Sequence, residues 1–82
     1  MELEEARKRI DEIDKNVSRL LAERFELSKA IGEEKKRLGL PVLNSKREEK
    51  VLENVTKNLT QEAKLCIIEV YNSILKASKK LQ

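Results

Sequence analysis

The fold is decided by residues 3–38, which read LEEARKRIDEIDKNVSRLLAERFELSKAIGEEKKRL. Apolar residues recur along this stretch in alternating steps of three and four, which predicts one α-helix with a heptad seam. At 1.5 Å per residue, this helix would be about 50 Å long. Gly39 follows as a helix stop signal, and Pro41 comes shortly after it. The seam consists of Leu3, Ala6, Ile10, Ile13, Val17, Leu20, Leu27, Ile31 and Leu38.

Two shorter helices are predicted in the remainder of the chain. The second begins near Asn44 and Ser45, because either residue can serve as its N-cap, and Ser45 with Glu48 has the spacing of a capping box. Thr60 is the predicted N-cap of a third helix that runs to the C-terminus. We therefore expect an all-α fold, a three-helix protomer with one very long N-terminal helix, in a single domain over residues 1–82. The apolar faces of the two short helices are Val51, Leu52, Val55 and Leu59, and Ala63, Ile67, Val70, Tyr71, Ile74 and Leu75.

The long helix cannot be covered by the rest of an 82-residue chain. A chain of this size buries a thin core and often needs a staple or a partner. Its one cysteine, Cys66, cannot form an internal disulfide, and we expect Cys66 and Tyr71 to be core residues without chemistry. Association with a second copy along the seam is therefore the expected source of stability.

The composition excludes several classes of function. The chain has no histidine and one cysteine, which excludes Ser-His-Asp and Cys-His catalysis and His- or Cys-rich metal sites. Its net charge of +3, from 18 basic and 15 acidic residues, is too balanced for a dedicated nucleic-acid binder. No apolar run is long enough to span a membrane, and the acidic N-terminus lacks the apolar core of a signal peptide, so a cytoplasmic location is expected.

Polar residues interrupt the apolar seam of the long helix. Arg24 occupies the heptad position between Leu20 and Leu27, where a cation is costly unless its charge is paired. A snorkelling side chain or an interhelix salt bridge would explain Arg24, and so would a guanidinium placed to bind an anion such as a carboxylate. Lys35 follows after about three helical turns and so projects from nearly the same side. Taken alone, Lys35 is an ordinary solvated lysine at a helix end.

The two short helices repeat this pattern. Glu48 and Arg47 lie one turn before apolar residues of the second helix, and Ser78 and Gln82 continue the apolar face of the third helix in steps of four. Taken singly, they have ordinary explanations: a capping glutamate, a surface arginine and a solvated C-terminus. Together with Arg24, they fit one polar pocket inside a helical core, whose ligand would be a small anion, a carboxylate.

Arg7 adds a geometric argument for a second chain. It lies 17 residues before Arg24, so the two are about 25 Å apart along one helix and cannot both reach one small ligand. They could do so if two long helices ran antiparallel and brought Arg7 of one chain towards Arg24 of the other. The local alternative is that Arg7 is a surface charge within Arg7-Lys8-Arg9.

An ordered set of short motifs runs through nearly the whole chain, from about Leu3 to Gln82. The motifs are Arg7 with Ile10-Asp11-x-Ile13-Asp14, Leu20-Leu21-Ala22-Glu23-Arg24 with Leu27-Ser28, Ile31-Gly32 with Lys35, Pro41-Val42, Asn44, Arg47-Glu48, and Ser78 with Gln82. In this order and spacing, the set resembles the all-helical (AroQ-type) class of chorismate mutase, in its free-standing prokaryotic form.

The resemblance implies an intertwined helical homodimer that rearranges chorismate to prephenate, on the route to Phe and Tyr, without a cofactor or a metal. A partner enzyme of the shikimate pathway docks onto some relatives. The position of Asn44 is often Asp in relatives, so a contact through the backbone would survive the change and one through the charge would not. The implied roles are carboxylate binding by Arg24, by the partner subunit's Arg7 and by Arg47; contact with the ether oxygen by Lys35 and Gln82; contact with the ring hydroxyl by Glu48 and the Asn44 region; and a carboxylate contact by Ser78.

A pericyclic rearrangement moves no proton and needs no nucleophile, so the missing histidine is no objection. Two alternatives remain open at this point. An isochorismate–pyruvate lyase would use a similar cationic pocket on the same scaffold. A non-catalytic helical dimerisation module would need the seam but not the polar residues, and it would not bind dicarboxylates.

Overall fold

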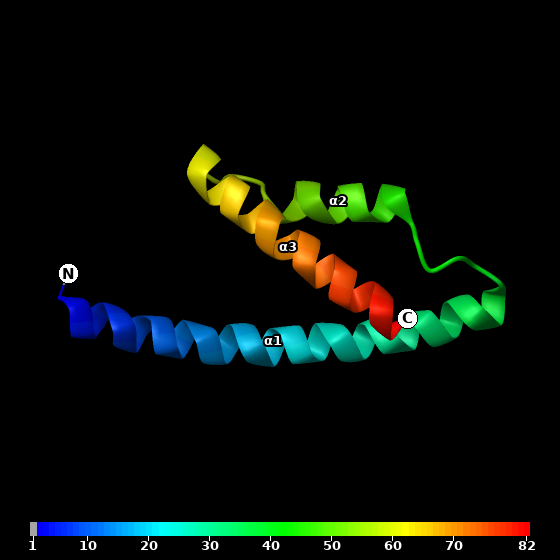
Figure 1. Ribbon diagram of the computed structural model, residues 1–82, viewed down its shortest axis with the longest axis horizontal. Coiled ribbons are helices and arrows are strands. Elements are labelled where there is room, and N and C mark those ends of the chain that lie inside the picture. Colours follow the sequence, from blue (N-terminus) through cyan, green and yellow to red (C-terminus); the bar gives the residue numbers. More distant parts are fainter. Residues whose placement is uncertain (1) are drawn as a thin grey trace.

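The computed structural model describes residues 2–82, which form three α-helices and no strand. Helix α1 spans Leu3–Leu38, α2 spans Ser45–Val55 and α3 spans Gln61–Leu81 (Figure 1). The predicted all-α fold with one very long N-terminal helix is therefore confirmed. The single domain over residues 1–82 stays a prediction, and residue 1 lies outside the described residues.

The helix ends follow from local chemistry. Gly39 ends α1 in the left-handed conformation, with φ of 70°, and its backbone N–H points back to carbonyls of the last turn. Asn44 is the N-cap of α2, because its Oδ1 accepts a hydrogen bond from the backbone N–H of Arg47 at 3.0 Å. This decides between the two predicted caps and leaves the Glu48 side chain free for other contacts. Thr60 caps α3 as predicted, accepting from the N–H of Ala63 at 3.2 Å.

Helix α3 lies between the other two helices. It packs on α2 and crosses the C-terminal half of α1, whereas α1 and α2 do not pack directly on each other within the described residues. The molecule is elongated, with extents of 53 × 25 × 16 Å, because the N-terminal end of α1 projects beyond the other helices (Figure 1). Because α3 contacts both other helices, residues of α1, α2 and α3 can contribute to one site near the place where α3 meets α1.

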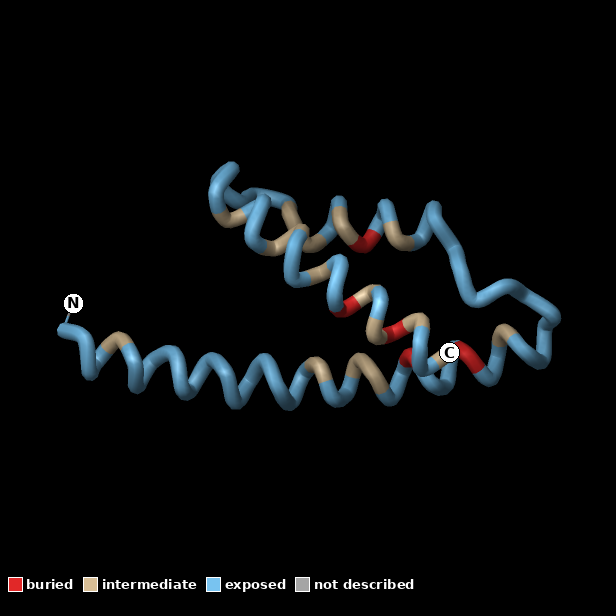
Figure 2. The backbone as a smooth tube through the Cα atoms, in the orientation of Figure 1, coloured by how far each residue is buried: buried red, intermediate tan, exposed pale blue. Residues whose placement is uncertain are grey.

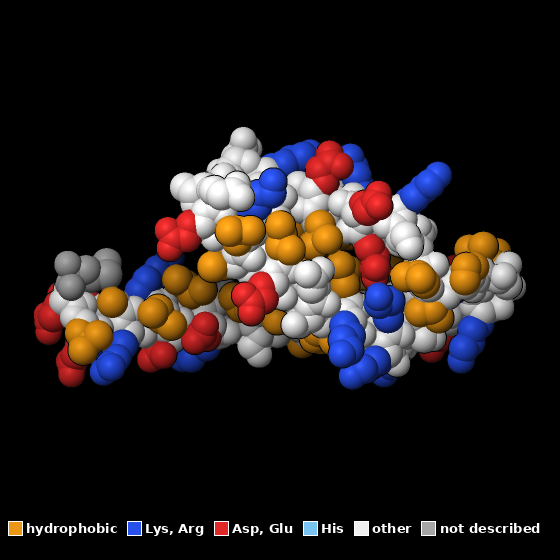
Figure 3. Space-filling model, turned by 45° about the horizontal axis from the view of Figure 1, so that its top comes forward, with side chains coloured by type: hydrophobic (Ala, Val, Ile, Leu, Met, Phe, Trp, Pro, Cys, Tyr) orange, Lys and Arg blue, Asp and Glu red, His pale blue; other side chains and the backbone are white. Residues whose placement is uncertain are grey.

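The protomer has a very small core. Among the described residues, the buried apolar side chains are Val51 of α2 and Ile74 of α3, each 8% exposed. The large seam residues of α1 remain between 43% and 62% exposed, and Figure 2 shows the first half of α1 almost entirely in the colour of exposed residues. In Figure 3, apolar side chains appear at intervals along this projecting part of α1. The seam forms as predicted, but the described residues leave its large side chains about half exposed.

The apolar face predicted for α3 is only partly covered. Ile74 is buried, but Val70 is 52% exposed, and Cys66, expected in the core, is exposed. Helix α3 contacts α1 near its own C-terminal end, so its earlier turns have α2 on one side and solvent on the other (Figure 1). The prediction for Cys66 was therefore wrong for the isolated protomer. None of the helices in residues 2–82 is both long and apolar enough to cross a membrane.

Candidate functional site

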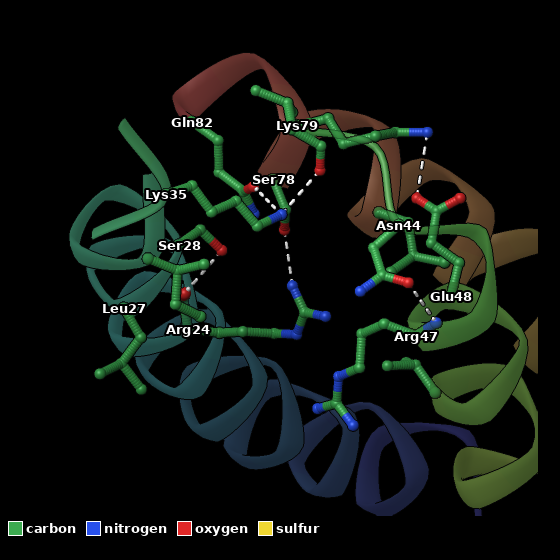
Figure 4. A pocket seen from close by; sticks show the side chains of 14 residues that line it. Arg24, Leu27, Ser28, Lys35, Asn44, Arg47, Glu48, Ser78, Lys79 and Gln82 are labelled. Carbon is green, nitrogen blue, oxygen red and sulfur yellow. Dashed lines mark hydrogen bonds and ion pairs between the residues drawn. The ribbon is translucent and has the colours of Figure 1, made fainter. Parts of the chain in front are cut away.

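A pocket lies where the end of α3 meets the second half of α1, with the first turn of α2 opposite (Figure 4). Its volume of about 370 Å³ lies within the range of about 300–1,000 Å³ that is usual for small-molecule sites. Seven of the eight predicted site residues line it, and they come from all three helices and the loop before α2. These seven residues are Arg24, Lys35, Asn44, Arg47, Glu48, Ser78 and Gln82.

Arg24 is held against α3 at the centre of this pocket. Its Nη1 donates a hydrogen bond to Oγ of Ser78 at 2.6 Å, and Ser78 is buried, with 5% of its surface exposed. Ser28 fixes the same turn of α1, because its Oγ donates to the backbone carbonyl of Arg24 at 3.1 Å. Within residues 2–82, no carboxylate pairs with the Arg24 guanidinium. A guanidinium carries five N–H donors, so most of them remain available to an anionic ligand.

Lys35 joins three segments of the chain. Its Nζ donates to Oε1 of Gln82 at 2.8 Å and to the backbone carbonyl of Val42 at 2.7 Å. An ammonium has three N–H donors, so one remains for a ligand. Because the amide oxygen of Gln82 faces Lys35, the Nε2 of Gln82 remains available to donate to another group (Figure 4). Lys35 and Gln82 together therefore present N–H donors at one end of the pocket.

Lys79 is a pocket residue that the sequence did not reveal. Its Nζ lies 3.0 Å from Oε2 of Glu48, and this ion pair joins α3 to α2 (Figure 4). Lys79 is one turn before Gln82, a spacing that could have placed both on one side of α3. With Arg24 and Arg47, which also line the pocket, the cations outnumber Glu48, the acidic lining residue. The pocket therefore suits an anion with more than one negative charge.

Ser28 and Gly32 are two further residues that the sequence did not single out by function. Both are buried on the side of α1 that faces α3. Small residues at this crossing allow the backbones of the two helices to approach each other closely. Their signal in the sequence is the step of four from Arg24 to Ser28 to Gly32, which places them in one line along α1.

Arg7 is the predicted site residue that is not brought to the pocket. It is exposed near the start of α1, and α1 is one uninterrupted helix from Leu3 to Leu38. The separation of about 25 Å from Arg24 expected along a helix therefore holds within one chain. No bend of α1 brings Arg7 to the pocket, so a single protomer offers the site without it.

Residues 6–82 match the family described as chorismate mutase type II. The chain is 36% identical, over 99% of its length, to a bifunctional chorismate mutase/prephenate dehydratase of Aquifex aeolicus, of which it covers 24%. It is 42% identical, over 67% of its length, to a chorismate mutase of Methanocaldococcus jannaschii, of which it covers 56%. The chain thus spans about a quarter and about half of the lengths of these curated relatives.

A solved structure of a conserved hypothetical protein from Pyrococcus furiosus has the same arrangement of helices. The TM-score is 0.80 at 39% sequence identity, and the match covers 96% of this chain and 92% of the other.

Proposed function

This chain belongs to the chorismate mutase type II family, and from that premise we propose that it is a chorismate mutase, an isomerase that rearranges chorismate to prephenate. The observation that carries the proposal is the pocket in which Arg24 and Lys35 of α1 meet Gln82 at the end of α3. They present N–H donors to one small volume, and the substrate of this reaction is a dicarboxylate with an ether oxygen.

The arginines bind the substrate carboxylates in this proposal. Arg24 is the first of them, because its guanidinium is half-buried, is anchored by Ser78 and has no carboxylate partner within the described residues. An uncompensated cation in such a site gains most when an anion arrives. Arg47 lines the same pocket from α2. Two carboxylates held by separate cations would fold a flexible substrate into the compact conformer that the rearrangement needs.

Lys35 and Gln82 stabilise the transition state. In a Claisen rearrangement of this kind, negative charge develops on the ether oxygen as its bond to the ring breaks. The free N–H of Lys35 and the Nε2 of Gln82 can donate to that oxygen, and their mutual hydrogen bond of 2.8 Å holds both in place beforehand. Donors fixed in advance contribute more to the transition state than to the ground state. No proton transfer is required of any residue.

Glu48 and the start of α2 position the ring hydroxyl. The pair with Lys79 occupies Oε2 of Glu48, so Oε1 remains to accept a hydrogen bond from a substrate hydroxyl. The Oδ1 of Asn44 is already occupied as the cap of α2. We therefore assign Asn44 a role through the backbone and through its hold on the first turn of α2, for which an aspartate would serve equally.

A homodimer completes the site in this proposal. The seam of α1 is uncovered over the whole helix, and a continuous apolar stripe of this length requires a partner surface. An antiparallel second copy would cover the seam and bring the partner subunit's Arg7 near Arg24. The same association would thus supply the missing core and a further cation for the substrate.

The test is an assay of the purified protein with chorismate, following the loss of its ultraviolet absorbance and identifying the product. We expect prephenate from the wild-type chain and a severe loss of rate for Arg24→Ala. Arg37→Ala is the matched control, because Arg37 lies on the same helix but outside the pocket, where it bonds to Glu34. A folded protein that forms no prephenate would contradict the proposal. Pyruvate released from isochorismate by that protein would favour a lyase instead.

A further inference from the structure

The two glycines of this chain serve different physical purposes. Gly39 has a φ of 70°, and a Cβ added there would meet nothing within 4 Å. Gly39 is thus required for its conformation, as the C-terminal stop of α1. Gly32 lies inside α1 and has no such backbone constraint. A glycine in a helix interior is less favourable than alanine, so Gly32 needs another reason.

That reason is the space beside Gly32, which Gln82 occupies. A Cβ on residue 32 would lie 2.6 Å from Cα of Gln82, 2.9 Å from its carbonyl oxygen and 3.1 Å from its Cβ. Two of these three atoms belong to the backbone, so no rotation of a side chain would relieve the overlap. Residue 82 would have to move until these contacts reached ordinary van der Waals separations of 3.4–4 Å.

The position of Gln82 matters because of what its side chain does. Lys35 lies three residues after Gly32 on nearly the same side of α1, and its Nζ donates to Oε1 of Gln82 at 2.8 Å. The approach of the two backbones at Gly32 therefore sets how far the Gln82 amide reaches over α1. Displacing the backbone of residue 82 would draw the amide away from Lys35 and from the place where the ether oxygen would lie.

We propose that Gly32 is a positioning residue for the reaction: its lack of a side chain seats the backbone of Gln82 against α1, so that the Gln82 amide meets Lys35. The proposal rests on the proposed function for its kinetic consequence but not for its geometry. It implies that the end of α3 is held in one position against α1 and is not frayed. It also explains why a poor helix former lies inside α1, one turn before Lys35.

The proposal predicts opposite effects of Gly32→Ala on turnover and on stability. Displacements of about 1 Å in a catalytic group can cost about 100-fold in rate, so we expect kcat to fall between about 10- and 100-fold. The KM for chorismate should change little, because Arg24 is two helical turns away from Gly32. Alanine is the better helix former, and the displaced residue is a single one at the end of α3, so the melting temperature should not fall.

Gly39→Ala is the matched control for Gly32→Ala. Both replace a glycine with the same residue, one inside α1 and the other directly after its end. At Gly39 the side chain meets open space but the left-handed φ is unfavourable for alanine. We therefore expect a lower melting temperature and an unchanged kcat for Gly39→Ala. Equal kcat values for the two variants would overturn the proposal.

A chain that ends at Leu81 tests whether Gly32 acts through Gln82. Removing residue 82 removes the three atoms nearest to an added Cβ. In this background, Gly32→Ala should cause no further loss of kcat and should raise the melting temperature. A further loss as large as in the full chain would contradict the proposal, because Gly32 would then act through something other than Gln82.

The side-chain amide signals of Gln82 in NMR spectra give a readout that does not depend on activity. We expect these signals to shift and broaden in Gly32→Ala and to stay in place in Gly39→Ala. Unmoved signals would overturn the proposal even if the rate fell. A wild-type chain that does not convert chorismate would contradict the proposed function alone, while shifted Gln82 signals in Gly32→Ala would still support the seat.

Discussion

The two halves of α1 carry the same kind of heptad pattern but lie in different surroundings. In the first half, apolar residues such as Ile10 and Val17 are about half exposed, and no other part of the described chain covers them. In the second half, Ser28 and Gly32 are buried beneath α3, and Arg24 is bonded to it. The periodic pattern determines a helix in both halves, whereas the small and polar substitutions mark where the chain folds back to build a site.

This contrast assigns a different task to each half. The second half belongs to a pocket that one protomer nearly completes by itself. The first half presents an exposed apolar stripe and Arg7, and none of these residues lines the pocket of its own protomer. We infer that the first half of α1 acts on the site of the partner chain.

The largest expected effect is in the second half, at Arg24. We expect Arg24→Ala to lower kcat/KM about 1,000-fold, because truncating one partner of a desolvated charge pair with the substrate is costly. Steady-state kinetics on a variant with an unchanged circular dichroism spectrum will measure it. A loss below about threefold would mean that the anchored guanidinium does not bind substrate.

Lys35→Ala should follow closely, with a different kinetic signature. We expect kcat to fall about 100-fold or more, with a smaller change in KM, because a donor to the ether oxygen acts mainly in the transition state. Rate constants at saturating chorismate will separate the two parameters. Equal effects on kcat and on binding affinity would assign Lys35 to ground-state binding instead.

Val17→Asp tests the first half of α1. A charge on a free surface would be harmless, but a charge on a covered seam would disfavour association and leave the site without its second chain. We expect at least about a tenfold loss of activity at micromolar protein, together with a smaller particle in sedimentation experiments. Asn16→Asp introduces the same group one residue away from the seam and should leave both unchanged. Identical behaviour of the two variants would mean that the seam is not an interface.

The smallest expected effect concerns the link between α2 and α3. Lys79 and Glu48 are paired at 3.0 Å but remain 37% and 26% exposed, and such pairs contribute about 0.2–1 kcal/mol. We expect Lys79→Met to raise KM a few-fold by loosening Glu48, and Lys79→Arg to restore it. Lys80→Met, on the next and exposed residue, serves as the control. A larger rise in KM for Lys80→Met than for Lys79→Met would mean that the pair of Lys79 with Glu48 does not support substrate binding.

The fold could be predicted from the sequence because each helix is marked by local signals at its ends and along its apolar face. The seam and Gly39 determine α1, and the side chains of Asn44 and Thr60 begin the two short helices. The pocket residues were predictable where a polar side chain broke an apolar face, as Arg24 and Ser78 do.

Contacts that depend on how helices cross were not predictable in this way. The spacing of Lys79 and Gln82 places them on one side of α3, but the pair of Lys79 with Glu48 depends on how α3 packs on α2. Gly32 matched a family motif, but its purpose depends on where the far end of the chain arrives. Cys66 was expected in the core because helical periodicity predicts which residues share a side of the helix. It does not predict whether another helix covers that side, and Cys66 is exposed.

Subunit exchange tests the central inference most directly, namely that one site combines Arg24 of one chain with Arg7 of the other. Arg7→Ala and Arg24→Ala are each expected to be nearly inactive alone. Unfolding and refolding them together should produce mixed dimers in which one of the two sites has both arginines, restoring about one quarter of the wild-type activity. If the mixture recovers no activity beyond that of the separate variants, the site does not use the two arginines from different chains, and the account of α1 is wrong.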